Sequence, residues 1–146
     1  MSNFEPPDPD FATRVRTSFA AQAAMRTLGA SLVKIAPGEA HIEMPFSAAL
    51  TQQNNFIHAG VIAAIVDSAC GYAALSLMPA GAGVLTVEFK VNLINPAAGE
   101  RFLAVGKVVK PGRTLTICSG EATARQGAER TLVAMMQATM IQMRPR

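Results

Sequence analysis

The stretch between His58 and Glu88 constrains the fold of this chain most. It is the most apolar part of the sequence, and Asp67 is the only side chain in it with a full charge at neutral pH. Burying a carboxylate without a partner is costly, so a fold keeps one there only where it is paired or used. The rest of the chain must therefore cover this stretch, and Asp67 is the first candidate for chemistry.

Residues 59–77 are predicted to form one helix, because the segment is rich in alanine, contains no proline, and is followed by Pro79 and two glycines. One helical stripe would face a core: Ile62, Val66, Ala69, Ala73 and Leu77. Asp67 lies about 120° from the centre of this stripe. The residues around it are small and would allow close approach by a second subunit, a substrate or both: Ala63, Ala64, Cys70, Gly71 and Ala74. The alternative to a chemical role is that Asp67 is a hydrogen-bonded structural residue. A membrane-spanning helix is rejected, because an aspartate at the centre of such a helix is costly.

The remaining pattern is mostly that of strands. Asp10 is predicted to be the N-cap of a helix that runs to about Thr27, and two strands, 28–35 and 39–46, follow around a turn at Pro37-Gly38. After the apolar helix, residues 85–93 alternate between apolar and polar, which predicts a half-buried strand. Three more strands are expected at 101–109, 114–125 and 131–142, the first two joined by the turn 110–113.

Consecutive strands with short turns imply an antiparallel sheet, which must wrap around the single long apolar helix. The sequence therefore predicts an α+β hotdog fold with an extra N-terminal helix. Residues 1–146 would form a single domain, with residues 1–9 as a loose tail.

Composition excludes several classes of function. The net charge is only +3, and one tyrosine and no tryptophan leave few platforms for stacking bases, so nucleic acid is not an expected partner. A cationic cluster at Lys107, Lys110 and Arg113 is better suited to a small phosphorylated ligand. Cys70 and Cys118 have no metal or redox spacing and are expected to be buried thiols. The polar, acidic N-terminus does not resemble a secretory signal, which favours a cytoplasmic location.

Three segments together resemble the hotdog acyl-CoA thioesterases of the phenylacetate-pathway (PaaI) type: TQQNNFIHAGVIAAIVDSACGYAA, VLTVEFKVNLINPAAGE and VVKPGRTL. The most specific part is His-x-Gly at the start of a helix with an aspartate nine residues after the histidine. The similarity covers about residues 28–142. It implies a cytoplasmic homodimer or homotetramer that hydrolyses acyl-CoA without a metal or cofactor and binds no nucleic acid or membrane.

The resemblance also implies roles for individual residues. Asp67 would act as general base or nucleophile, the N–H of Ala59 would face the thioester carbonyl, and His58 would shape that pocket. Thr86 would orient water. Five residues would border the coenzyme A groove: Asn95, Pro96, Lys110, Gly112 and Arg113. Of these, Lys110 and Arg113 would meet phosphate, although solvated charge is the ordinary state of such turn residues.

Two positions depart from the family pattern. Ala59 replaces the first of two glycines after the histidine, and its methyl group narrows the approach without removing the N–H. Gln52 replaces an asparagine six residues before the histidine and has a longer reach. The residues also permit other interpretations: His58 as a simple helix cap, Thr86 as an ordinary strand residue, His41 as structural, and Met135, Met136 and Met140 as core. An enoyl-CoA hydratase and a non-catalytic acyl-CoA binding module remain alternative functions.

Overall fold

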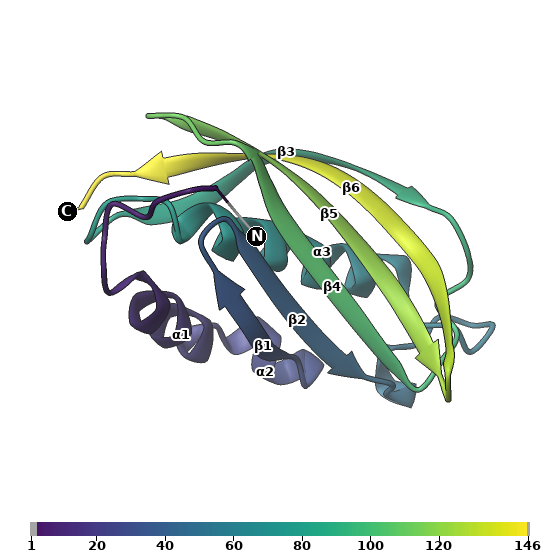
Figure 1. The fold of residues 1–146 in the computed structure, drawn as a ribbon. Helices are drawn as coiled ribbons and strands as arrows, with labels where there is room; N and C mark the ends of the chain where they lie inside the picture. Colours follow the sequence, from purple (N-terminus) through teal and green to yellow (C-terminus); the bar gives the residue numbers. More distant parts are fainter. Residues whose placement is uncertain (1–2, 146) are drawn as a thin grey trace.

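The computed structural model describes residues 3–145, in which an antiparallel sheet curves around one long helix (Figure 1). The helices are α1 (Phe11–Ala21), α2 (Ala23–Leu28), a short 3₁₀ turn (Ala48–Leu50) and α3 (Ala59–Leu75). The strands are β1 (Ser31–Ala36), β2 (Glu39–Pro45), β3 (Gly83–Leu93), β4 (Arg101–Lys110), β5 (Leu115–Gln126) and β6 (Glu129–Met143). Their order across the sheet is β1-β2-β4-β5-β6-β3, and all neighbours are antiparallel. The predicted hotdog arrangement is confirmed.

Helix α3 forms the centre of the core. Four of the five predicted stripe residues have no exposed surface, and the fifth, Leu77, lies in the turn that follows the helix. The helix ends two residues before the predicted boundary because Ser76 closes it. The Ser76 hydroxyl donates to the Ala73 carbonyl (2.6 Å) and accepts from the Gly38 N–H (2.8 Å), which ties the helix end to the β1–β2 turn. Within residues 3–145, no helix is long and apolar enough to cross a membrane.

A pair of glycines brings the sheet against α3. Gly106 of β4 and Gly120 of β5 are directly opposite each other, and a Cβ on Gly106 would lie 2.3 Å from the carbonyl carbon of Ala69. This close approach covers Cys70, whose thiol faces Gly120, and both Cys70 and Ala74 have no exposed surface. The expectation that these two residues lie on an open side of the helix is therefore wrong. Both thiols are buried, as expected.

Strand β3 differs from its expected half-buried form. Leu85, Val87, Phe89 and Leu93 are 44–54% exposed, because β3 is an edge strand that pairs only with β6 among the described residues. A β-bulge at Val87 also divides the alternating pattern, since Thr86 pairs with Met140 and Glu88 pairs with Thr139. As a result Thr86 before the bulge and the apolar Phe89 beyond it share the helix-facing side of the sheet.

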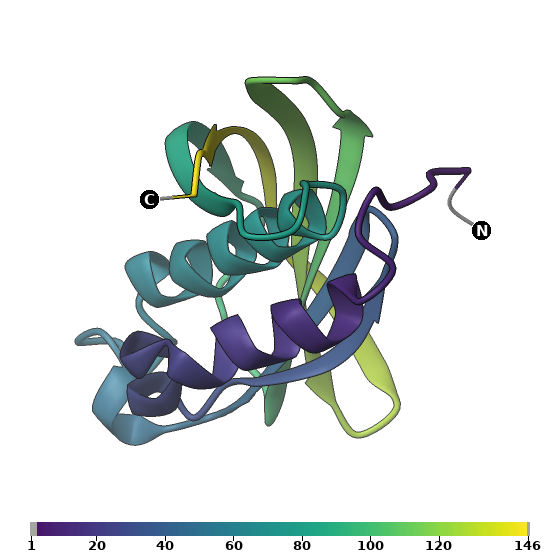
Figure 2. The ribbon, with the colours of Figure 1, turned by 90° about the vertical axis from the view of Figure 1, so that its left-hand side faces the viewer.

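The predicted N-terminal helix is two helices. Gln22 has an extended backbone (φ −79°, ψ 102°) that separates α1 from α2, and α1 lies alongside α3 (Figure 2). Asp10 caps α1 without a side-chain hydrogen bond. Its neighbour Asp8 is buried and forms an ion pair with Arg14 at 3.2 Å, and Phe4 packs against the core. Residues 3–9 are thus held on the domain rather than loose, and residues 1 and 2 lie outside the described part.

Two lesser expectations have mixed outcomes. Met136 and Met140 belong to the core, but Met135 is half exposed on the outer face of the sheet, because the side chains of β6 alternate there. His41 lies on β2, where its Nε2 is 2.6 Å from a carboxylate oxygen of Glu39. Since this contact joins two partly buried side chains of the same strand, it agrees with a structural interpretation of His41.

Candidate active site

Asp67 is half buried on α3 and has one hydrogen-bond partner among the described side chains. The Thr86 hydroxyl donates to its Oδ1 at 2.6 Å. Burial raises the pKa of Asp67 above its ordinary value, and the Thr86 hydrogen bond opposes this effect. The bulge at Val87 produces this contact, because it turns Thr86 toward the helix. A half-buried carboxylate with a raised pKa is a stronger base than an exposed aspartate, which suits it to accept a proton.

A pocket of about 440 Å³ opens beside Asp67. One wall is polar and joins α1 to α3: the Ser68 hydroxyl donates to the Gln22 side-chain oxygen (3.2 Å), and the Gln22 amide donates to the Tyr72 hydroxyl (3.3 Å). The opposite wall is largely apolar and comes from β3 and β6: Val84, Leu85, Met140 and Met143. None of these three polar residues was predicted to line a pocket. The i, i+4 spacing of Ser68 and Tyr72 was a usable signal, whereas Gln22 was hidden inside a pattern that reads as continuous helix.

The start of α3 forms a second site. His58 is the N-cap, and its Nδ1 accepts from the Gly60 N–H at 2.8 Å. The interpretation of His58 as a helix cap is therefore confirmed. The Ala59 N–H makes no hydrogen bond within residues 3–145, and free N–H groups at a helix start favour negative charge. The Gln52 side-chain oxygen accepts from the Asn54 N–H, which leaves its NH₂ group as a donor.

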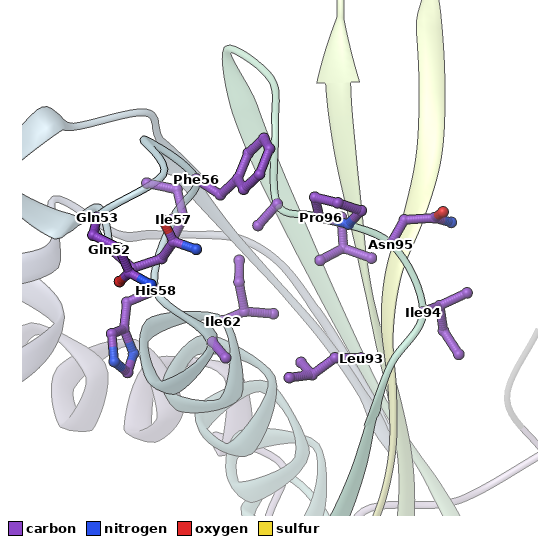
Figure 3. A pocket seen from close by; sticks show the side chains of 13 residues that line it. Gln52, Gln53, Phe56, Ile57, His58, Ile62, Leu93, Ile94, Asn95 and Pro96 are labelled. Carbon is purple, nitrogen blue, oxygen red and sulfur yellow. The ribbon is translucent and has the colours of Figure 1, made fainter.

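A pocket of about 460 Å³ lies in front of this helix start (Figure 3). Gln52, His58 and Ala59 line it on one side, and Asn95 and Pro96 line it on the other. The apolar lining was not predicted: Phe56, Ile57, Ile62, Leu93, Ile94 and Val133. Figure 3 shows Leu93 reaching from β3 toward the helix that carries Ile62. Asn95 is fixed, because its side-chain amide donates to the Leu132 carbonyl at 2.9 Å.

One chain does not bring all predicted residues together. Ala59 and Asp67 are eight residues apart on α3, or about 12 Å along its axis, and they line different pockets. Lys110, Gly112 and Arg113 lie at the β4–β5 hairpin. This hairpin is at the opposite end of the sheet from the C-terminal end of β3 (Figure 1), which Asn95 follows in the sequence. The described residues contain no cluster of three His, Cys, Asp or Glu side chains that would hold a metal.

Comparison with known proteins agrees with the hotdog fold. The family model described as the thioesterase superfamily matches residues 54–131. A crystal structure of a thioesterase family protein from Silicibacter pomeroyi has a TM-score of 0.90 and 52% identity, over 91% of this chain and 98% of that one. The PaaI protein of the phenylacetic acid degradation operon of E. coli shares the fold, with a TM-score of 0.83 and 18% identity over 93% of this chain and 95% of that one.

A protein from Saccharolobus solfataricus that is named as a candidate esterase is 30% identical to this chain over 90 residues. The alignment covers 62% of this chain and 64% of that protein, so the chain spans less than two thirds of the length of this relative.

Proposed function

The chain belongs to the thioesterase superfamily, and we propose that it hydrolyses an acyl-CoA thioester to a carboxylic acid and free coenzyme A. The observation that carries the proposal is Asp67, a half-buried carboxylate with a raised pKa that Thr86 holds toward a pocket. A cytoplasmic location, where the two buried thiols stay reduced, is part of the same proposal.

Asp67 supplies the base or the nucleophile. As a base it takes a proton from water while the water oxygen attacks the thioester carbonyl, and the proton then passes to the thiolate as the C–S bond breaks. As a nucleophile its oxygen displaces the thiolate to form an anhydride, which water hydrolyses in a second step. In both routes the Thr86 hydroxyl orients the carboxylate through its 2.6 Å hydrogen bond.

The start of α3 supplies the oxyanion site. The Ala59 N–H, which has no hydrogen-bond partner within residues 3–145, and the positive end of the helix stabilise the negative charge that develops on the carbonyl oxygen. The NH₂ group of Gln52, in the same pocket, is a second donor. His58 acts by engaging the Gly60 N–H, which fixes the helix start and leaves the N–H of Ala59 for the substrate.

We infer that the complete site forms between two copies of the chain. Asp67 is about 12 Å from Ala59 in one copy, whereas a two-fold partner with its α3 antiparallel brings Asp67 of one copy to Ala59 and Gln52 of the other. Strand β3 offers the surface for such a partner, since one of its edges has no strand partner among the described residues and its apolar side chains are exposed. The same two-fold exchanges the ends of the sheet, which moves Lys110, Gly112 and Arg113 toward the Asn95–Pro96 side of the partner.

Release of coenzyme A, followed with a thiol reagent, tests the function. A panel of aryl and medium-chain acyl-CoA substrates should yield free thiol, whereas an enoyl-CoA hydratase would consume enoyl absorbance without thiol and a binding module would do neither. Asp67→Asn preserves the shape, and loss of a general base should lower kcat about 10²–10⁴-fold. Asp10→Asn is the matched control at an exposed carboxylate outside the site. Near-normal turnover by Asp67→Asn would rule out this mechanism.

A further inference from the structure

Three arginines form a row across the outer face of the sheet. Arg101 of β4 is directly opposite Arg125 of β5, and Arg125 is directly opposite Arg130 of β6. All three are exposed, while their strand neighbours Phe102 and Ala124 are buried on the helix side. Like charges in directly opposed positions destabilise a sheet. This row of arginines therefore costs stability unless an anion neutralises it.

The chain itself supplies little negative charge to neutralise these three arginines. The Glu43 carboxylate is 2.5 Å from the Arg101 guanidinium, and the Arg125 Nε donates weakly to the Gly127 carbonyl at 3.4 Å. The Arg130 side chain has no hydrogen bond or ion pair within the described part of the chain. A small hollow of about 40 Å³ lies among the three guanidinium groups and Glu43. Three positive charges thus share one carboxylate around a recess.

The arginine row lies at the end of the sheet that also carries the helix-start pocket. Asn95, which lines that pocket, donates to the carbonyl of Leu132. Leu132 is two residues from Arg130, or about 7 Å along β6. The hairpin with Lys110 and Arg113 is at the other end of the sheet. Within one chain, the arginine row is therefore the cationic group next to the Asn95 side of the pocket.

We propose that Arg101, Arg125 and Arg130 bind the phosphates at the nucleotide end of coenzyme A while the pantetheine arm passes Asn95. This inference rests on the proposed function, because it takes the acyl-CoA as the source of the phosphate. Planar guanidinium groups match phosphate oxygens in pairs, and a row of them neutralises several negative charges at once. Bound phosphate would also remove the repulsion between the opposed arginines.

Calorimetric titration with adenosine 3′,5′-bisphosphate tests the arginine row without any need for turnover. Arg125→Gln and Arg130→Gln should each weaken binding about 2–5-fold, the range expected for exposed charge pairs. Arg16→Gln removes the same charge from the exposed surface of α1 and should leave the affinity unchanged. Inorganic phosphate alone should bind far more weakly than the bisphosphate. Equal affinity for both would overturn the nucleotide as the ligand, and unchanged affinity in both row variants would overturn the site.

Kinetics with matched thioesters provide the second arm. In the row variants KM should rise for acyl-CoA but stay constant for the same acyl group on pantetheine, which has no nucleotide phosphates. An equal rise for both substrates would contradict the proposal. Failure of the proposed function is distinct: the wild type would then hydrolyse neither substrate, while calorimetry would still report on the arginine row. Folding is controlled by thermal unfolding, where removal of an opposed arginine should leave the midpoint unchanged or raise it.

Discussion

Replacing Gly106 by alanine should separate β4 from α3. The new Cβ would lie 2.3 Å from the carbonyl carbon of Ala69 and 2.4 Å from both the Ala69 oxygen and the Cys70 nitrogen. Ordinary contacts need about 3.5 Å, so helix or strand must move by about 1 Å. All three atoms belong to the backbone, and no change of rotamer relieves the clash. Since overpacking a core costs about 1–3 kcal/mol or more, we expect a loss near 3 kcal/mol.

Urea unfolding and thermal melts measure this loss, which corresponds to a drop in Tm of roughly 10 °C for a domain of this size. Two glycines give graded controls. At Gly120 the Cβ would meet the side-chain atoms Val66 Cγ1 (2.6 Å) and Cys70 Sγ (2.8 Å), which are able to turn, so a smaller loss of about 1–2 kcal/mol is expected. At Gly127 no atom of the described residues would lie within 4 Å of the new Cβ, and only the φ of +58° opposes alanine, at about 1 kcal/mol. A loss at Gly106 no larger than that at Gly127 would refute the reasoning.

Four further outcomes are expected. Activity should rise with pH through the raised pKa of Asp67, and Thr86→Val should move this limb of the kcat/KM profile to higher pH because it removes a hydrogen bond to the carboxylate. The native state holds the Asp67 proton more tightly than the unfolded chain does. Protonated Asp67 therefore stabilises the native state at low pH, and this stabilisation is lost as the pH rises through the native pKa. The free energy of unfolding of Asp67→Asn, measured by urea titration, should lack this pH dependence. Replacing Lys110 and Arg113 together by alanine should raise KM for acyl-CoA and reduce its salt dependence with less effect on kcat, and an unchanged KM would place the groove elsewhere. Mixing inactive Asp67→Asn chains with inactive Gln52→Ala chains should restore part of the activity, and a fully active monomer in equilibrium sedimentation would exclude a shared site.

Most of the fold was predictable from the sequence, because the apolar pattern and turn residues of each segment agree with the way the segment packs in the domain. The helical stripe on α3 is one such case, and the short turns between strands are another. The break at Gln22 was not predictable, since its partners, Ser68 and Tyr72, are about 50 residues away in sequence. The bulge at Val87 likewise depends on pairing with β6, and an alternating sequence continues through it without a signal.

The candidate site was only partly predictable from the residues themselves. A lone charge in an apolar stretch identified Asp67 directly, and the resemblance supplied the expectation for Thr86, which hydrogen-bonds to it. The prediction that Cys70 lies on an open side of α3 was wrong, because Gly106 of β4 and Gly120 of β5 let the sheet cover this residue. The opposed arginines escaped notice for a similar reason, since only strand register brings Arg101, Arg125 and Arg130 together.

The position of β3 at the sheet edge has a consequence for synthesis of the chain. Within residues 3–145, β3 pairs with no strand except β6, which is the last to be translated. While β4 and β5 leave the ribosome, β3 has no hydrogen-bonding neighbour and its apolar side chains stay in water. The sheet is therefore completed only after Met143 has emerged, and the nascent chain passes through an interval in which an unpaired hydrophobic strand is open to wrong partners.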